Sequence, residues 1–528
     1  MPTTATDELL GHPKGLYVCF ATEMWERFAF YGMKALLFLY LVGHHKFTDD
    51  DGYMLLGTYA GLAYALPLVG GMLADRFLGM RKAVVFGGLL LVLGQLGMAY
   101  TGDPAVGVQG QAELDELAIQ VMYMSLALIG VGVGFLKPNI STIVGKLYRG
   151  DDPRRDSGFT IFYMGINIGA LMSALIVGYI GIEYGWGWGF GLSGVLMLFG
   201  LGQFLWGQRH LHGHAEPPDP AALRRPVVAG LSTELLIYLG GLLATVMVWQ
   251  VLQTKIDLGP LGALVGGHEV TLTEVVAVAM GLALFVWFIW FLFTDISARE
   301  RGRMIVLMTL IVVSALFWGL YEQTYGTWVA FSERVMDRQM LGLEWTPSQL
   351  TSVGAFFVVT LTPLFAWLWP RLDRLRLNPS TPAKFGLGLL FAGLSFGVLV
   401  YATGQLDSAG LVSVWWLVLA YFVLVLGEMV LSPIGLSAVT TLSVPRVVGL
   451  MMGAWFLFSA FGEIIAGRFG TWAAVEPEPD GSIAVGKAMA VYADVFADLM
   501  WIGLGSGVVM LVASPLLVRL TREADPTR

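Results

Sequence analysis

Apolar residues run along this chain in long stretches that short polar segments separate. About 20 mainly apolar residues are enough for a helix to cross the hydrocarbon core of a bilayer, so each stretch predicts one membrane-spanning helix. The pattern predicts fourteen such helices. They cover residues 15–43, 53–78, 81–101, 118–147, 157–182, 186–208, 227–252, 273–294, 303–332, 347–370, 381–403, 411–441, 446–470 and 492–520.

The basic residues gather on one side of the predicted membrane. If the N-terminus lies in the cytoplasm, 22 of the 31 Lys and Arg residues fall in cytoplasmic segments and only 6 in the opposite ones. Cytoplasmic loops carry the excess of Lys and Arg in membrane proteins. The charge pattern therefore predicts an even number of spans, with both termini in the cytoplasm.

A polar, proline-rich segment divides the chain. Residues 209–226 read RHLHGHAEPPDPAALRRP, which is typical of a connection outside the membrane. We predict an all-α polytopic membrane protein with two six-helix halves, residues 1–208 and 303–528. Residues 209–302 form a linker and an insert of two extra central helices. Halves of this kind commonly enclose a substrate site near the bilayer midplane.

The composition narrows the class of protein further. Hydrophobic residues make up 56% of the chain and charged residues 13%, against about 25% charged in soluble domains. The single cysteine, Cys19, excludes internal disulfides and thiolate metal clusters. The net charge of −8 argues against a nucleic-acid partner.

Histidine placement restricts the proton chemistry. All seven histidines are predicted to lie in loops or in the N-terminal arm, so a proton carrier inside the membrane must be a carboxylate. The residues are His12, His44, His45, His210, His212, His214 and His268.

One segment resembles a nucleotide-binding loop, from Gly481 to Ala488. Its last position is Ala488 where that loop needs a Ser or Thr hydroxyl for magnesium, and no strand precedes it. We predict no ATP binding, no cofactor, no resident metal ion and no catalytic residue. Movement of a solute across the membrane must then be driven by a gradient.

The first predicted helix carries the densest set of charges. A charged side chain at the bilayer centre costs at least about 2.5–3.5 kcal/mol, so it must face the protein interior or a cavity. Spacings of three and four place one polar stripe on this helix. The stripe consists of Glu23, Glu26, Arg27, Phe30, Tyr31 and Lys34.

Two carboxylates beside one guanidinium form an unbalanced set, in which one Glu can accept and release a proton. The alternative is a static ion pair. Lys137 before Pro138, Glu322 and Glu428 are further ionisable residues inside predicted helices. Each is either an interhelical ion pair or a cavity residue, and the two roles are compatible. Other acids lie nearer the outer ends of the last helices and are interpreted as structural: Glu463, Asp494 and Asp498.

Three motifs together carry a family resemblance. Gly71 to Lys82 is similar to the G-x-x-x-D-R-x-G-R-[RK] loop of the major facilitator superfamily, with one extra residue before Gly79. Residues 23–31 match E-x-x-E-R-F-x-x-Y, and residues 162–169 match F-Y-x-x-I-N-x-G. The chain resembles bacterial members of the proton-coupled oligopeptide transporter family, which also carry two additional central helices. This resemblance implies the major facilitator fold.

The resemblance also implies roles for individual residues. Proton coupling falls to Glu23, Glu26, Arg27 and Glu322. Lys34 and Lys137 would hold the peptide carboxylate, and Glu428 the amino terminus. The peptide backbone and side-chain pockets would involve Phe30, Tyr31, Tyr64, Asn167, Trp318 and Trp455. Lys34 replaces the more usual Arg, which gives a point charge in place of a bidentate fork.

The implied function is proton-coupled import of di- and tripeptides by a functional monomer in the bacterial inner membrane. The partners would be the peptide, protons and the lipid bilayer. Lys137 is expected to alternate between a first-helix glutamate and the peptide carboxylate. The alternatives are a symporter for nitrate or another small anion, a multidrug antiporter and a membrane enzyme. Glu428 argues against an anion, which has no ammonium group to offer it.

Overall fold

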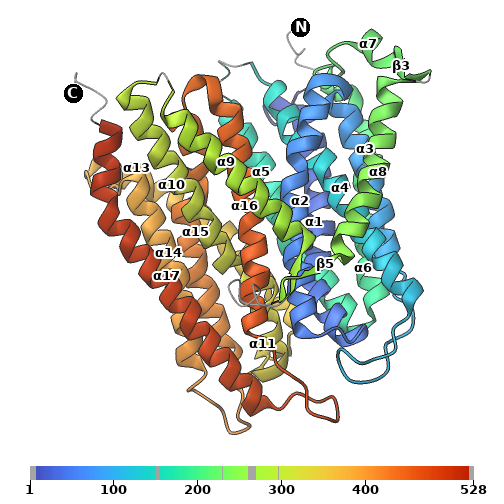
Figure 1. Ribbon diagram of the computed structural model, residues 1–528, viewed down its shortest axis with the longest axis vertical. Helices are drawn as coiled ribbons and strands as arrows, with labels where there is room; N and C mark the ends of the chain where they lie inside the picture. Colours follow the sequence, from blue (N-terminus) through green and yellow to red (C-terminus); the bar gives the residue numbers. More distant parts are fainter. Residues whose placement is uncertain are drawn as a thin grey trace.

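Long helices run most of the height of the molecule in the computed structural model (Figure 1). The structure describes residues 8–149, 152, 154–228, 230–259, 269–294 and 296–522, so the predicted loop residue His268 lies outside the described residues. Both ends of the described chain lie at the same end of the helix bundle, at the top of Figure 1. We call this end the terminal side and the opposite end the outer side.

Six helices form an N-terminal group in which each helix packs against others of the same group. α1 packs against α5 and α6, and α3 packs against α4 and α6. Glycines allow close approach, since a Cβ added to Gly70 of α2 would lie only 2.1 Å from the carbonyl oxygen of Gly134 in α4. The helices are α1 (Lys14–Leu39), α2 (Asp49–Leu73), α3 (Met80–Met98), α4 (Glu116–Lys146), α5 (Arg155–Glu183) and α6 (Trp186–Gly207).

The last part of the chain forms a C-terminal group. α14 packs against α15 and α17, and α10 packs against α16. The helices are α10 (Ala298–Tyr321), α11 (Thr327–Val335), α12 (Pro347–Leu350), α13 (Ser352–Arg374), α14 (Thr381–Ala402), α15 (Val414–Leu442), α16 (Val448–Trp472) and α17 (Val485–Arg522).

The span predicted as one helix over 303–332 is interrupted. A 3-10 turn, η6 (Glu322–Tyr325), separates α10 from α11. Gly326, with φ −114° and ψ −94°, leaves the helical region directly after the turn. The interruption places Glu322, Gln323 and Thr324 in the interior, where all three are buried.

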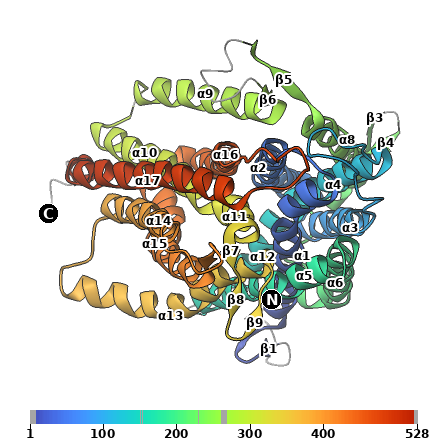
Figure 2. The same ribbon diagram turned by 90° about the horizontal axis from the view of Figure 1, so that it is seen from below.

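The two-helix insert joins both groups. α8 (Thr233–Gln253) packs mainly on α4, whereas α9 (Leu272–Leu292) packs on α16 and lies at the margin of the bundle (Figure 2). Lys82 Nζ of α3 pairs with Glu234 Oε1 of α8 at 2.5 Å. Arg468 Nε of α16 pairs with Glu274 Oε1 of α9 at 2.5 Å. Ion pairs therefore anchor the insert to both groups.

Short elements connect the long helices. Antiparallel pairs form between β1 and β2, β3 and β4, β5 and β6, and β8 and β9, and β7 pairs in parallel with β10. The π-helix η3 lies where the sequence carries an extra residue before Gly79, and a π-turn holds one residue more than an α-turn. These elements are α7 (Pro220–Arg224), β1 (Glu8–Leu9), β2 (His12–Pro13), β3 (Pro226–Val228), β4 (Leu231–Ser232), β5 (Lys255–Asp257), β6 (Glu269–Thr271), β7 (Met336–Asp337), β8 (Gln339–Met340), β9 (Leu343–Glu344), β10 (Val412–Ser413), η2 (Tyr40–His44), η3 (Ala74–Leu78), η4 (Gln208–Leu211) and η7 (Pro445–Val447).

Thirteen helical spans of the described residues are long and apolar enough to cross a membrane. α1 is a further 26-residue helix, but it carries too many charged side chains to count among these thirteen spans. It carries Glu23, Glu26, Arg27 and Lys34, all of them buried. Counting α1, the fold agrees with the predicted all-α polytopic architecture. The placement of His44 was also predicted wrongly, because His44 lies in η2, which continues α1, and not in a loop.

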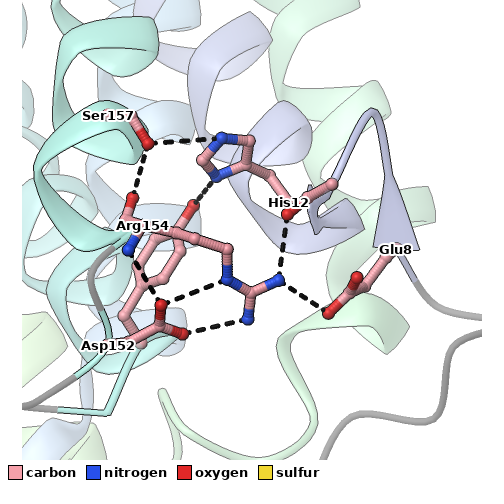
Figure 3. A network of polar contacts seen from close by, with 7 residues as sticks. Glu8, His12, Asp152, Arg154 and Ser157 are labelled. Carbon is pink, nitrogen blue, oxygen red and sulfur yellow. Dashed lines mark hydrogen bonds and ion pairs between the residues drawn. The ribbon is translucent and has the colours of Figure 1, made fainter.

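On the terminal side, the β1–β2 hairpin is bound to the start of α5 (Figure 3). Arg154 donates to Glu8 Oε1 at 3.0 Å, to the Gly11 carbonyl at 2.9 Å and to both oxygens of Asp152. The hydrogen bonds from Arg154 hold the pKa of Asp152 below its usual range. His12 Nδ1 lies 2.7 Å from the Tyr148 hydroxyl of the α4–α5 connection. We call this set of contacts the hairpin clasp.

Candidate functional site

A cavity of about 220 Å³ lies between the N-terminal and C-terminal groups. Side chains from α1, α2, α4 and α5 line one wall, and side chains from α10, η6, α13 and α15 line the other. The lining residues include most of the ionisable groups that the sequence placed inside the membrane. Nine predicted site residues line it: Glu23, Arg27, Tyr31, Tyr64, Lys137, Asn167, Trp318, Glu322 and Glu428.

Arg27 organises the charges of α1. Its Nη2 donates to Glu26 Oε1 at 2.6 Å, and its Nε also bonds Glu26. The same Nε lies 3.3 Å from Glu23 Oε1, one helical turn away. Glu23 Oε2 is buried and accepts no hydrogen bond from the described residues. Glu23 is therefore the less firmly held of the two carboxylates, and it is the one that lines the cavity.

Lys137 occupies a different position from the one expected. Its ammonium lies 4.1 Å from the centroid of the Tyr64 ring, a cation–π contact between α4 and α2. Among the described residues it forms no ion pair with Glu23 or Glu26, because both carboxylates contact Arg27. Lys137 thus presents a cation at the cavity wall that no carboxylate neutralises directly.

The opposite wall carries an acid. Glu428 of α15 is 7% exposed, and its Oε2 accepts no hydrogen bond from the described residues. Its hydrogen-bonding neighbour is Tyr321 of α10. Aromatic side chains line the same cavity, namely Tyr163, Trp318, Tyr321 and Tyr421. The cavity therefore offers cations on its N-terminal wall and a carboxylate oxygen on its C-terminal wall.

The cavity is closed on the outer side. Lys34 Nζ of α1 lies 2.7 Å from Glu322 Oε2 and 2.9 Å from Glu463 Oε1 of α16. A Cβ added to Gly57 of α2 would lie only 2.8 Å from the Cα of Gly467 in α16. These helices are therefore in direct backbone contact across the two groups.

The terminal half of the cavity contains its most exposed lining residue. Tyr163 of α5 lines the cavity and is 44% exposed. α5 begins on the terminal side at Arg155, so Tyr163 lies on that half of the helix. The structure is therefore shut toward the outer side, and its lining is more exposed toward the terminal side.

Four predicted site residues do not line the cavity. Glu26 is buried behind Arg27, and Phe30 packs against Tyr31 and Tyr59. Lys34 is held in the outer closure, and its assignment to the peptide carboxylate stays a prediction. Trp455 packs over α15, where a Cβ added to Gly435 would lie 2.0 Å from its ring.

Several cavity residues were not selected from the sequence. Tyr163, Tyr321, Tyr325 and Tyr421 line the cavity. Tyr163 lies inside the recognised motif over residues 162–169, so its position carried a usable signal. Glu463 was interpreted as structural, but it shares Lys34 with Glu322.

The cavity lies between two packed helix groups, its walls carry charged residues, and it is closed on the outer side. These features are those of a polytopic membrane transporter. Comparison with known sequences identifies the family. The POT family pattern matches residues 81–479. YclF, an uncharacterized transporter of Bacillus subtilis, is 35% identical over 462 residues, covering 86% of this chain and 87% of the relative. Dipeptide and tripeptide permease A of Erwinia pyrifoliae is 31% identical over 531 residues, covering 99% and 98%.

Solved structures agree with this result. A crystal structure of a mutant of the peptide transporter POT with alafosfalin has a TM-score of 0.78 and 32% identity, covering 97% of this chain and 96% of that one. A POT family transporter with 5-aminolevulinic acid has a TM-score of 0.77 and 27% identity, covering 97% and 98%. The chain belongs to the POT family of bacterial peptide transporters. It is a transporter and not an enzyme, as the sequence predicted.

Proposed function

We propose that this protein is a symporter that imports di- and tripeptides together with protons by alternating access. The observation that carries the proposal is the pair of charged walls. Arg27 and Lys137 supply cations on the N-terminal wall, and Glu428 supplies a carboxylate on the C-terminal wall. A zwitterionic peptide fits both walls at once, so its binding draws the two helix groups together.

Charge balance links peptide and proton. Arg27 and Lys137 together balance Glu23 and Glu26 when the cavity is empty. A peptide carboxylate bound there adds one negative charge, and a proton on Glu23 or Glu26 removes it again. Peptide and proton therefore favour each other's binding, which is the thermodynamic requirement for coupling.

The size of the cavity limits the substrate. An extended chain spans at most about 3.3–3.6 Å per residue. A cavity of about 220 Å³ between two fixed charged walls suits two or three residues. The aromatic wall around Glu428 makes sequence-tolerant contacts, so we expect many peptide side chains to be accepted. Tyr31, Tyr64 and Asn167 contact the peptide backbone in this proposal, and Trp318 lines a side-chain pocket.

The names of relatives support the substrate class. One is a dipeptide and tripeptide permease, and another, at 34% identity, is a peptide transporter of Yersinia enterocolitica. In the proposed cycle, residues 1–208 and 303–528 rock against each other, and the insert within 209–302 follows them. In this cycle Lys34 first pairs with Glu322 and closes the outer side. Lys34 contacts the peptide carboxylate only in a later step of the cycle.

We further propose a bacterial inner-membrane location with both termini in the cytoplasm, because most Lys and Arg residues lie on the terminal side. The cavity would then face the cytoplasm in the present conformation. We also propose that the functional unit is one chain, because both charged walls of the cavity come from the same chain.

A competition assay in proteoliposomes tests the proposal. Uptake of a labelled dipeptide under an inward proton gradient should be inhibited by unlabelled di- and tripeptides, and much less by a tetrapeptide. Nitrate and N-acetylated, amidated dipeptides serve as controls and should not compete. Inhibition by nitrate, or equal inhibition by tetrapeptides, would contradict the proposed substrate class.

A further inference from the structure

The two insert helices are joined on the outer side by a short structure, which we call the outer strap: β5, β6 and residues 272–275 at the start of α9. Three residue pairs join β5 to β6 in an antiparallel ladder. Thr271 and Glu274 form a capping box that continues β6 into α9. Seen from the outer side, β5 and β6 lie at the margin of the bundle between α8 and α9 (Figure 2). The outer strap is therefore one hydrogen-bonded unit.

The outer strap contacts α2 of the N-terminal group. Thr58 Oγ1 donates to Thr271 Oγ1 at 3.2 Å, and Lys255 of β5 pairs with Asp51 in the first turn of α2. Thr58 lies next to Gly57, whose close contact with the backbone of α16 belongs to the outer closure. The outer strap is thus attached to the N-terminal group directly beside the closure.

The outer strap also contacts α16 of the C-terminal group. Arg468 Nε lies 2.5 Å from Glu274 Oε1, and Arg468 Nη2 donates to Glu274 Oε2 at 2.9 Å. The same Nη2 donates to the carbonyl of Glu269 in β6 at 2.8 Å. Because α2 and α16 belong to different groups, they must separate when the outer side opens. The outer strap cannot then keep both attachments.

The attachment to α2 is the weaker of the two. The forked pair of Arg468 with Glu274 is stronger than a single lysine contact, and its side chains are only 17% and 13% exposed. The side chains of Lys255 and Asp51 are 38% and 35% exposed, and an exposed ion pair contributes little. A cavity of about 240 Å³, lined by residues of both the outer strap and α2, leaves this side incompletely packed. We therefore expect the outer strap to leave α2 and to stay on α16.

The end of α8 supplies a pivot for this movement. α8 ends at Gln253, and Thr254, with φ −89° and ψ 115°, leaves the helical region before β5 begins. Gln120 Nε2 of α4 donates to Gln253 Oε1 at 2.9 Å, at the outer end of a helix that packs mainly on α4. α8 can therefore stay on the N-terminal group while the outer strap turns away at Thr254.

We propose that the two-helix insert controls the opening of the outer side. In this proposal the outer strap holds α2 against α16 while the outer side is closed, and it must release α2 before the outer side opens. The inference rests on the alternating access of the proposed function. Contacts that exist in only one of two states favour that state, so the outer strap favours the outer-closed state.

Reversible cross-linking tests the release from α2. Asp51→Cys and Lys255→Cys, combined in a Cys19→Ala background, can be joined by a short bis-methanethiosulfonate reagent that a reducing agent cleaves. We expect the cross-link to abolish both dipeptide uptake and peptide exchange in proteoliposomes, and reduction to restore both. Gln120→Cys with Gln253→Cys is the matched control. Its cross-link joins α8 to α4 within the part that moves together, so transport should persist.

Thiol labelling of the purified protein tests the bias toward closure without peptide or protons. Ala466→Cys, in the Cys19→Ala background, places a reporter in the outer closure, because Ala466 of α16 is 9% exposed and lines a small void there. Adding Thr58→Val or Lys255→Ala should raise the labelling rate several-fold. Adding Lys487→Ala should leave the rate unchanged, since this outer-side lysine bonds a backbone carbonyl within the C-terminal group.

Two results would overturn the inference. Transport that persists after the cross-link between positions 51 and 255 would exclude release of α2 as a required step. Labelling rates that stay unchanged in both Thr58→Val and Lys255→Ala would exclude the bias toward closure. Wild-type protein that takes up no dipeptide would contradict the proposed function, while the labelling rates would still decide whether the outer strap holds the outer side closed.

Discussion

The Lys137 ammonium of α4 lies 4.1 Å from the centroid of the Tyr64 ring of α2. A lysine held by an aromatic face keeps its charge available, because the ring competes for it less strongly than a carboxylate would. Arg27 contacts both nearby glutamates, and among the described residues Lys137 forms no ion pair with either of them. This arrangement is suited to a substrate carboxylate.

We therefore expect Lys137→Ala to weaken dipeptide binding. A hydrogen bond to a charged group contributes about 1.5–3 kcal/mol, so the loss should be roughly one to two decades in affinity. Tyr64→Leu should give a smaller loss. Tyr64→Phe retains the ring beside Lys137 and loses only the hydroxyl proposed to contact the peptide backbone, so its loss should be smaller still. Competition binding to purified protein measures all three variants.

The pH dependence of the same assay tests whether Lys137 also alternates with a glutamate. If it does, Lys137→Ala should flatten the binding profile between pH 5 and 8 as well as lower it. A uniform loss with an unchanged profile would mean that Lys137 only binds the carboxylate. Wild-type affinity in the variant would remove Lys137 from the site.

We expect Glu428 to bind the amino terminus of the peptide. Its free Oε2 faces the cavity from the C-terminal wall, so Glu428→Gln should weaken ordinary dipeptides by about one to two decades. N-acetylated dipeptides lack the ammonium and should bind both proteins equally weakly. If blocked and unblocked peptides lose the same factor in affinity, Glu428 acts on conformation and not on the amino terminus.

A second ion pair closes the outer side. Arg334 Nη1 of α11 lies 2.6 Å from Asp49 Oδ2 of α2, and Nη2 lies 2.7 Å from Oδ1. Removing one member of a buried pair costs about 3–5 kcal/mol. Arg334→Ala should therefore lower the melting temperature and increase labelling of cysteines introduced into the outer half of the cavity. Arg338→Ala is the control, because its exposed ion-pair partners Glu333 and Glu344 and the three backbone carbonyls that it bonds all lie within the C-terminal group. Unchanged labelling in Arg334→Ala would exclude the pair as an outer lock.

We expect the hairpin clasp to require Arg154 and to weaken at acidic pH. The Asp152 pKa is held low by hydrogen bonds from Arg154, so the pairing stabilises the folded state above the ordinary carboxyl pKa of about 3.9 and is lost as pH falls below it. Arg154→Ala should increase hydrogen exchange over residues 8–13 already at pH 7, whereas wild type should be protected from pH 5 to 8. Arg155→Ala is the matched control, because Arg155 lies over Phe159 instead. Equal exchange in both variants would contradict the clasp.

The sequence predicted the spans and much of the cavity for a physical reason. Charges are costly in lipid, so the stripe through Glu23, Arg27 and Tyr31 had to face inward, and helical spacing alone assigns these residues to one face. Because of the same cost, Lys137, Glu322 and Glu428 were expected to face the protein interior. Each of these residues lines the cavity.

The partners of buried charges could not be predicted in the same way. Lys34 pairs with residues 288 and 429 positions away, which depends on how whole helices pack. A single sequence gives no information about such a pairing, so Glu463 was interpreted as a static acid. The turn at Glu322–Tyr325 was missed because the predicted span 303–332 was drawn through it. Its polar residues and the following Gly326 interrupt the apolar pattern there.

Peptide-driven proton entry tests the central claim most directly. Proteoliposomes containing a pH indicator, clamped at an inside-negative potential, should acidify when an unlabelled dipeptide is added outside. Each entering proton gains about 2.3 kcal/mol per 100 mV, so the potential alone should drive accumulation. Glu23→Gln or Glu26→Gln should abolish acidification and accumulation while peptide exchange stays measurable. Dipeptide uptake by the wild-type protein with no acidification, or acidification that persists in both variants, would contradict the account.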